Sequence, residues 1–462
     1  MLFAALAAGG YLRFANLGAL EMSADEGASW AAASAPSVAE VIARQPALNP
    51  GELPIHDLML HGWIDLFGES ISAMRTMSAL LGAVSIALVY FVTRELFVSE
   101  PGTESRAAES TLSSDDVRMV SALAALIFAV NLVTIKYSRE ARMYPVMLVA
   151  ILAQVAMFLR ALRVGSFVNY VVVAILTALA IGANFSALLI PATEAVWLVY
   201  VIARTRDGVD NPDSKRAFAL ALSLACGGLI LAPKLLSQLH AASALNAAGD
   251  VIGWRKPPPL YAPIALFNKA SGSFAFPCLA ALAIWGAVRG WRREHDAVLF
   301  ALLWMWLPPL LMVVASYAIA PVFIERYALS CFVPFFILIA LGIFAMRRES
   351  VRVGTLAIIL ALSLSHIASY ARKPHDAQYR EAVAAANAAL KPGEAMTVVP
   401  SYAIEVLRYY LPADQRGRAV RYDVSSTNAA VLILGDQDAT ESYRKDYPQT
   451  VARLRGLTVK RK

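Results

Sequence analysis

The chain alternates long apolar runs with shorter polar segments. Eleven runs approach the length that crosses the hydrocarbon core of a bilayer as a helix, which is about 20 residues. Their length and scarcity of charge favour transmembrane helices over strands or short core helices. The runs are 2–19, 73–97, 118–135, 144–163, 167–185, 186–204, 217–235, 273–290, 297–318, 328–346 and 352–370.

The polar segments between these runs differ in charge. Basic residues are concentrated in every second segment, and short basic loops tend to stay in the cytoplasm. The alternation therefore predicts an N-terminus inside the cell and a last segment, 371–462, outside. The other segments predicted to lie outside are 20–72, 136–143, 236–272 and 319–327.

Composition supports a membrane protein and excludes a nucleic-acid binder. Hydrophobic residues make up 58% of the 462 residues and charged residues 16%, whereas soluble domains carry about 25% charged residues. The mean hydropathy is +0.56. The formal charge of +7 is not arranged as a basic stripe interleaved with aromatics, and it fits cytoplasmic loops instead. We predict an all-α membrane bundle of about 11 helices.

Two of the outer segments are long enough to have structure of their own. The first, 20–72, contains an Ala-rich amphipathic stretch at 25–45, which predicts a helix lying in the membrane interface. Ser23 and Glu26 have the spacing of a capping box at its start. The tail alternates helical and strand patterns, which predicts a small α/β domain over 371–462, beside a transmembrane domain over 1–370.

Several short motifs lie at the predicted outer ends of the helices. They are Asp25-Glu-Gly-Ala-Ser-Trp30, His61-Gly-Trp63 with Leu66-Phe-Gly-Glu-Ser70 and Met74-Arg75, Tyr137-Ser-Arg-Glu-Ala-Arg-Met-Tyr144, and Glu325-Arg-Tyr327. In this order the chain resembles family 39 of the GT-C glycosyltransferases, which is dolichyl-phosphate-mannose-protein mannosyltransferase-like and includes the aminoarabinose-transferase-like enzymes. The resemblance implies a polytopic GT-C bundle that uses a polyprenyl-phosphate-linked sugar.

Asp25 and Glu26 are the first candidate catalytic residues. One interpretation is structural, because carboxylates in the first turn of a helix are favoured by its dipole. The resemblance instead implies that Asp25 is the catalytic base. A polyprenyl phosphate is a good leaving group, so one carboxylate that takes the proton of the acceptor hydroxyl can suffice. Glu26 is interpreted as a helper, a metal ligand or simply part of the cap.

Arginines at two predicted outer helix starts are candidates for binding the donor phosphate. Arg139 and Arg142 are three residues apart, so on a helix they would share a face and grip a phosphate together. The alternative is that they are interfacial anchors. Arg326 repeats the pattern at another helix start, with an ion pair to Glu325 as its alternative. The further candidates are Tyr144 and Lys234 for phosphate binding, and Glu140, Glu325 and Tyr327 for substrate binding.

One position departs from the family pattern. Where members commonly have Pro-Pro-Leu-Tyr-Tyr, this chain has Leu53-Pro-Ile-His-Asp57. His56 and Asp57 thus replace residues that would hold the donor phosphate. They either form a local hydrogen bond or belong to a changed donor or metal site, so the identity of the sugar is not transferred.

The sequence therefore predicts a multi-pass glycosyltransferase of the cytoplasmic membrane with its active site facing the periplasmic or extracellular side. Its partners would be a polyprenyl-phosphate-linked donor, membrane lipids and a lipid, glycan or protein acceptor, without nucleic acid. No cofactor is required by the pattern, although a divalent metal is compatible with the carboxylates. The alternative is a transporter or flippase of a lipid-linked saccharide, for which repeats or paired broken helices would be expected.

Overall fold

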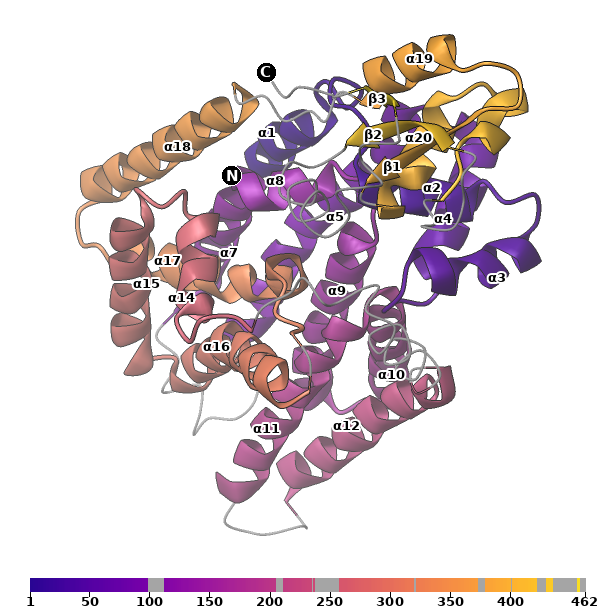
Figure 1. Cartoon of the computed structure of the whole chain (residues 1–462). Helices are drawn as coiled ribbons and strands as arrows, with labels where there is room; N and C mark the ends of the chain where they lie inside the picture. Colours follow the sequence, from indigo (N-terminus) through magenta and orange to yellow (C-terminus); the bar gives the residue numbers. More distant parts are fainter. Residues whose placement is uncertain are drawn as a thin grey trace.

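A computed structural model describes residues 1–98, 112–204, 211–234, 236, 257–319, 321–372, 379–399, 401–421, 429–434 and 455–457. Most of these residues form a bundle of helices (Figure 1). Its apolar helices are α1 (Leu2–Phe14), α5 (Ile71–Phe97), α7 (Ser114–Ala129), α8 (Leu132–Ser138), α9 (Tyr144–Val164), α10 (Phe167–Ala183), η1 with α11 (Phe185–Leu188, Leu189–Arg204), α12 (Pro212–Leu229), α14 (Ala262–Ala270), α15 (Phe276–Trp291), α16 (His295–Ala318), η3 with α17 (Glu325–Cys331, Phe332–Phe344) and α18 (Glu349–Ala371).

The helices fit a multi-pass membrane protein. In the described residues six are long and apolar enough to cross a bilayer, and a bent pair raises this number to seven. Each of the eleven predicted runs coincides with a helix or a helix pair, but α1, α10 and α15 are shorter than a standard span. The fold class is confirmed, and the number of membrane crossings stays a prediction.

The predicted span 118–135 is not one straight helix. It breaks after Ala129, and α7 and α8 meet at an angle of 65°. Asn131 caps α8 by accepting hydrogen bonds from the amides of Val133 and Thr134. The buried Arg13 of α1 donates to the carbonyl of Ala129 at 2.9 Å, and so satisfies a backbone oxygen at the break. The apolar pattern did not show this bend because both halves are hydrophobic.

The first outer segment folds into three helices rather than one. These are α2 (Ala24–Ala33), α3 (Val38–Leu48) and α4 (Ile55–Phe67). Seven of the ten residues of α2 are buried, so the prediction of an interfacial helix at 25–45 was wrong for this part. Its Ala-rich surface packs against protein, because small side chains let neighbouring backbones approach closely.

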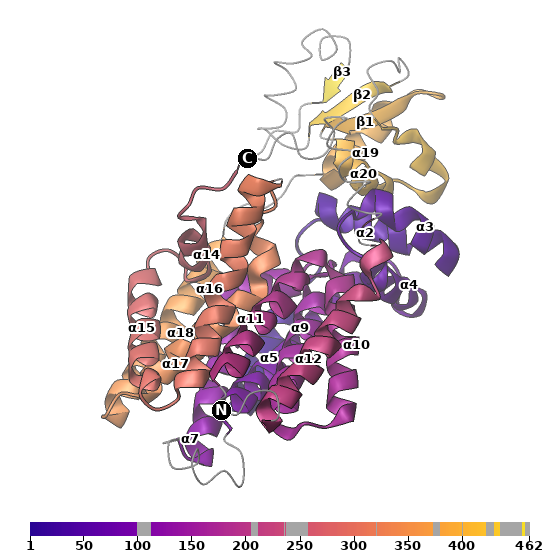
Figure 2. The same cartoon turned by 90° about the horizontal axis from the view of Figure 1, so that it is seen from below.

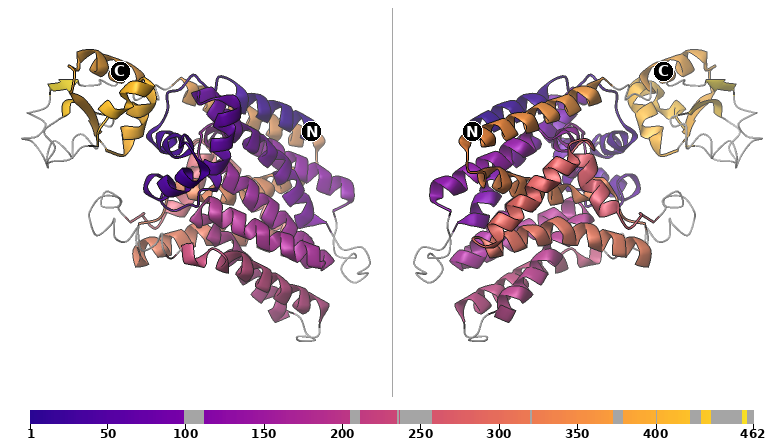
Figure 3. Two further views of the ribbon diagram at one scale, coloured as in Figure 1. Left: turned by 90° about the vertical axis from the view of Figure 1, so that its right-hand side faces the viewer. Right: turned by 90° about the vertical axis from the view of Figure 1, so that its left-hand side faces the viewer.

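The tail contains a small parallel sheet with helices, as the sequence predicts. Strands β1 (Ala395–Val399), β2 (Ala429–Leu434) and β3 (Arg455–Leu457) pair in the order β1-β2-β3. Two helices, α19 (Tyr379–Ala389) and α20 (Ile404–Tyr410), accompany the strands. Figures 2 and 3 show this unit at one end of the bundle, beside α2–α4.

The tail and the first outer segment share a hydrophobic core. Val406 of α20 packs against Gly27 of α2, where an added Cβ would lie 2.8 Å from a Val406 methyl group. Trp30 contacts the ring of Tyr409 edge to face at 5.2 Å. The amide of Met22 also donates to the hydroxyl of Tyr410 at 3.0 Å. The tail thus holds the helix that carries Asp25 and Glu26.

Candidate functional site

The candidate site begins at the first turn of α2. Ser23 and Glu26 form the predicted capping box, in which the Ser23 side chain accepts from the amide of Glu26 and the Glu26 carboxylate accepts from the amide of Ser23. Asp25 lies between them in the sequence, and its side chain is 40% exposed. The helix cap therefore gives the two adjacent carboxylates different surroundings.

Asp25 forms an ion pair with Arg326 of η3, about 300 residues away in the chain. The guanidinium of Arg326 also lies over the ring of Tyr144, at 5.5 Å from its centroid. Its Nε has no hydrogen-bond partner among the described residues. This ion pair brings together the motif that begins at Asp25 and the motif Glu325-Arg-Tyr327. The predicted alternative for Arg326, an ion pair with Glu325, is wrong because Glu325 pairs with Lys269.

Glu26 is buried and both of its oxygens are occupied. The Nε and a terminal nitrogen of Arg75 donate to the two oxygens at 2.7 Å each, and the amide of Ala141 donates at 2.9 Å. Burial alone would raise the pKa of Glu26, but the hydrogen bonds and charge of Arg75 lower it below its usual value. The Glu26 carboxylate connects α2 to Arg75 of α5 and to the backbone of Ala141. Because it is buried and both of its oxygens accept hydrogen bonds, we do not assign it to substrate binding.

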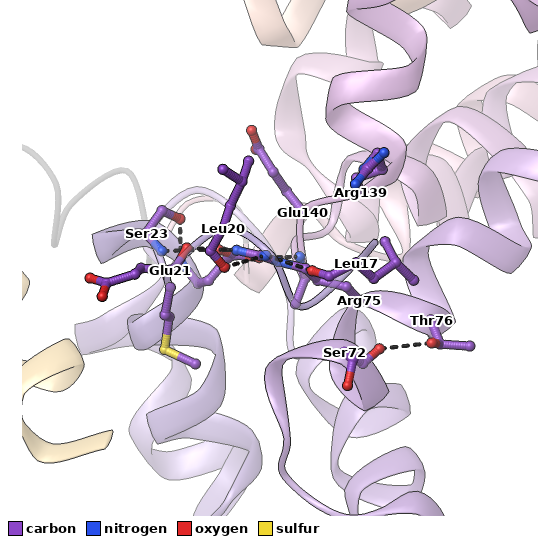
Figure 4. A network of polar contacts seen from close by, with 12 residues as sticks. Leu17, Leu20, Glu21, Ser23, Ser72, Arg75, Thr76, Arg139 and Glu140 are labelled. Carbon is purple, nitrogen blue, oxygen red and sulfur yellow. Dashed lines mark hydrogen bonds and ion pairs between the residues drawn. The ribbon is translucent and has the colours of Figure 1, made fainter. Parts of the chain in front are cut away.

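Arg75 contacts both α2 and the segment that precedes it. This residue was assigned no role from the sequence. Besides Glu26 it donates to the carbonyl oxygens of Leu17, Leu20 and Glu21, each at 2.8 Å (Figure 4). These carbonyls belong to the irregular segment after α1, where the backbone lacks helical partners. The signal was a charge in the first turns of an apolar helix, which is rarely tolerated without a function or a partner.

Arg139 and Arg142 do not share a helix face, because α8 ends at Ser138 and α9 begins at Tyr144. Arg142 is buried and turns toward α2, where it donates to the carbonyl oxygen of Asp25 at 2.9 Å and to Ser29 at 2.8 Å. Arg139 is half-buried and donates to the carbonyl of Leu12 in the last turn of α1 and to that of Asn16 just beyond it. The prediction of a shared phosphate grip was wrong in its geometry.

His56 and Asp57 lie in a buried network behind α2. Nδ1 of His56 and a carboxylate oxygen of Asp57 are 3.1 Å apart, and each side chain is 1% exposed. Asn49 donates to the other oxygen of Asp57 at 3.0 Å and accepts from Arg142 at 2.6 Å. The structure thus contains the local hydrogen bond between His56 and Asp57, which was one of the two interpretations. Through Asn49 and Arg142 this pair is also connected to the backbone of Asp25.

Two further carboxyl groups near Asp25 are altered by burial. Burial raises the pKa of Glu52 well above its usual range, although the charge of Arg142, 3.7 Å away, opposes this. Burial also raises the pKa of Glu140 to about 7, with Lys136 opposing the shift from 4.0 Å. A carboxyl group that titrates near neutral pH beside a candidate base is a feature of functional sites.

The remaining predicted residues are at the edge of this arrangement. Tyr327 is half-buried in η3, and Glu325 is held by Lys269 of α14. Lys234 is exposed beyond the end of α12, and its role stays a prediction. Within the described ranges no group of three or more His, Cys, Asp or Glu side chains is placed to hold a metal ion, so we assign no ligand set.

Comparisons with known proteins point to one fold. ArnT from Cupriavidus metallidurans, solved with undecaprenyl phosphate, has a TM-score of 0.57 at 13% identity, with 98% of this chain and 88% of ArnT covered. AglB from Archaeoglobus fulgidus, an oligosaccharyltransferase solved with an inhibitory peptide and a dolichol-phosphate, has a TM-score of 0.54 at 11% identity. That alignment covers 99% of this chain and 64% of AglB.

Sequence comparison gives no further assignment, since no family model and no curated protein matches the chain. The structural likeness nevertheless extends over nearly the whole length of the chain. The protein is therefore a multi-pass membrane protein with the GT-C glycosyltransferase fold. Membership of family 39 stays a prediction.

Proposed function

We propose that the protein is a membrane glycosyltransferase that moves a sugar from a polyprenyl-phosphate-linked donor to a hydroxyl acceptor. The observation that carries this proposal is the pairing of an exposed carboxylate, Asp25, with Arg326. The pair combines a proton acceptor with a cation that suits a phosphate. It lies in a fold similar to two proteins whose structures contain undecaprenyl phosphate and dolichol-phosphate.

The location of the pair supports a lipid-linked donor. By the loop charges, Asp25 is on the outer face of the cytoplasmic membrane. Nucleotide sugars are cytoplasmic, whereas a sugar carried on a membrane lipid reaches an outer site directly. Segments 20–72, 136–143 and 319–327 also gather at one end of the bundle, through contacts among Glu26, Ala141, Asp25 and Arg326.

In the proposed reaction Asp25 accepts the proton of the acceptor hydroxyl. The acceptor oxygen then attacks the anomeric carbon of the sugar, and the bond from that carbon to the phosphate oxygen breaks. The electron pair leaves with the polyprenyl phosphate, so negative charge grows on the phosphate during the step. Arg326 is positioned to stabilise that charge when the substrate takes over its pairing with Asp25.

The other charged residues of the site act in this proposal as supports. Arg142 holds the backbone of Asp25, and Glu26 with Arg75 holds the turn that precedes it. Tyr144 lies under the guanidinium of Arg326 and limits its orientation. Arg139 binds the end of α1, so we place it at the rim of the donor site rather than on the phosphate.

Replacement of Asp25 by Asn tests the assignment. The matched control is Asp65→Asn, which removes a carboxylate from the same outer segment at a side chain that is 68% exposed. Mass spectrometry of membrane glycolipids and glycoproteins would compare cells with the wild-type chain, each variant and no chain. We expect Asp25→Asn to lower transfer by a factor of about 10² to 10⁴, the usual contribution of a general base, and Asp65→Asn to leave it unchanged.

Full transfer by Asp25→Asn at wild-type protein levels would overturn the catalytic assignment. The transporter alternative predicts a different mass spectrum. Lipid-linked saccharide would accumulate without the chain, and no acceptor would gain a sugar directly in its presence. A sugar-sized mass that appears on one class of acceptor in a purified, reconstituted system therefore separates the two functions.

A further inference from the structure

A second charged site lies at the α15–α16 and α17–α18 junctions, away from Asp25. A cavity of about 400 Å³ is lined by residues from three regions of the chain. The first region is the start of α7, which contributes Asp116. The second is the junction of α15 and α16, and the third is the junction of α17 and α18. Its charged side chains are Asp116, Arg289, Arg293, Glu294, Arg347 and Arg352.

The cavity has a surplus of positive charge, since it contains four guanidinium groups and two carboxylates. Two of the arginines lie over aromatic rings, with Arg289 5.2 Å from the ring centre of Trp285 and Arg352 4.8 Å from that of Phe344. Among the described residues none of the four forms an ion pair with a carboxylate. Arg352 also donates to the carbonyl oxygen of Met346 at 2.7 Å. Within the described ranges the positive charge of the cavity is therefore not neutralised by an ion pair of these arginines, which suits an anionic ligand.

An apolar groove adjoins this cavity. The groove has a volume of about 560 Å³ and is lined by Cys278, Ala281, Leu282 and Trp285 of α15, together with residues of the α17–α18 junction. Arg289 and Arg347 line both the groove and the cavity. Cys278 and Trp285 are exposed on the surface of the bundle. A hydrocarbon chain in the groove would therefore end at the basic cavity.

We propose that this combined surface binds an anionic membrane lipid, with its phosphate among the arginines and a chain along α15. Arginine suits phosphate because its planar guanidinium donates two parallel hydrogen bonds. A soluble phosphate would gain nothing from the apolar groove, which favours a lipid as the occupant. By the loop charges this surface faces the cytoplasmic leaflet, where anionic lipids attract basic residues. The inference does not depend on the proposed glycosyl transfer.

The test compares two double variants that remove the same charge. Arg289→Gln with Arg347→Gln alters the two arginines shared by the cavity and the groove. Arg292→Gln with Arg348→Gln alters their exposed neighbours, which do not line either space. Native mass spectrometry of the full chain would count bound phosphatidylglycerol and phosphatidylcholine, with inorganic phosphate as a competitor.

We expect the wild-type chain to retain phosphatidylglycerol in preference to phosphatidylcholine. The first double variant should weaken this retention about tenfold or more, and the control about twofold or less. Ala281→Trp, which fills the groove without changing charge, should also weaken it and covers the case in which the first variant folds poorly. Equal losses in both double variants would overturn the site in favour of diffuse surface charge. Displacement of the lipid by millimolar inorganic phosphate would overturn the role of the groove.

Discussion

Arginines in two regions of the molecule behave differently. Around Asp25 they are wholly or partly buried and bound, as with Arg75 to Glu26 and Arg142 to the backbone of Asp25. At the α15–α16 and α17–α18 junctions Arg289, Arg293 and Arg347 are exposed on a cavity wall. The same residue type thus holds the fold together in the first region, whereas in the second it lines a cavity and forms no ion pair among the described residues. An arginine predicted to lie on the outer side of the membrane is therefore not, for that reason alone, a phosphate-binding residue.

The largest expected effect that tests this comparison comes from Glu26→Gln. The change removes the charge that faces the buried Arg75, and breaking a buried ion pair lowers the free energy of unfolding by about 3–5 kcal/mol. The control is Glu40→Gln, in an exposed pair with Arg44 whose side chains are each 40% exposed. It should cost about 0.5 kcal/mol. Equal thermal stability of the two variants in detergent would contradict the supporting role of Glu26.

A smaller effect is expected where the tail meets α2. Gly27→Ala places a methyl group 2.8 Å from a side-chain carbon of Val406 and 3.0 Å from its backbone nitrogen. Such overpacking lowers the free energy of unfolding by about 1–3 kcal/mol. Gly10→Ala in α1 is the control, because nothing lies within 4 Å of its added carbon. Limited proteolysis should release the tail faster in Gly27→Ala alone; equal rates would show that α2 and α20 are not tightly packed.

Glu140 predicts a pH dependence of stability. Its pKa is about 7 in the folded protein against 4.5 as the reference value. Between these values the folded state keeps a proton that the unfolded state has lost, so stability falls as the pH rises through this window and levels off above it. Glu140→Gln cannot titrate and should lack this part of the slope. Thermal melts from about pH 4.5 to 8 measure it, with Asp65→Asn as the variant that should keep the slope.

The smallest effect is expected for the arginines of the cavity. Arg293→Gln removes an exposed charge without breaking an ion pair in the described structure. In lipid-free detergent its stability should stay within about 0.5 kcal/mol of wild type. A loss as large as that of Glu26→Gln would erase the distinction between the two regions. Melting curves of the two variants in the same detergent make the comparison.

The sequence predicted the elements better than their contacts. Apolar runs located the bundle helices, and the alternation of patterns in the tail predicted a small α/β unit, where the structure has α19 and β1 among its elements. These features depend on local hydrophobicity and period. The bend between α7 and α8 escaped prediction because it is stabilised by Arg13 from another helix. The burial of α2 escaped for the same reason, since its partner Val406 is distant in the chain.

The same division applies to the site. Ser23 and Glu26 show the start of α2 in the sequence itself, because a capping box involves only neighbours in the chain. Only the tertiary structure decided that Asp25 faces Arg326 while Glu26 faces Arg75. Both carboxylates have nearly the same local sequence, and their partners come from helices that meet through long-range packing. The sequence alone therefore determined that two carboxylates begin α2. The fold decided that the side chain of Asp25 is exposed and that of Glu26 is buried, because their ion-pair partners come from distant parts of the chain.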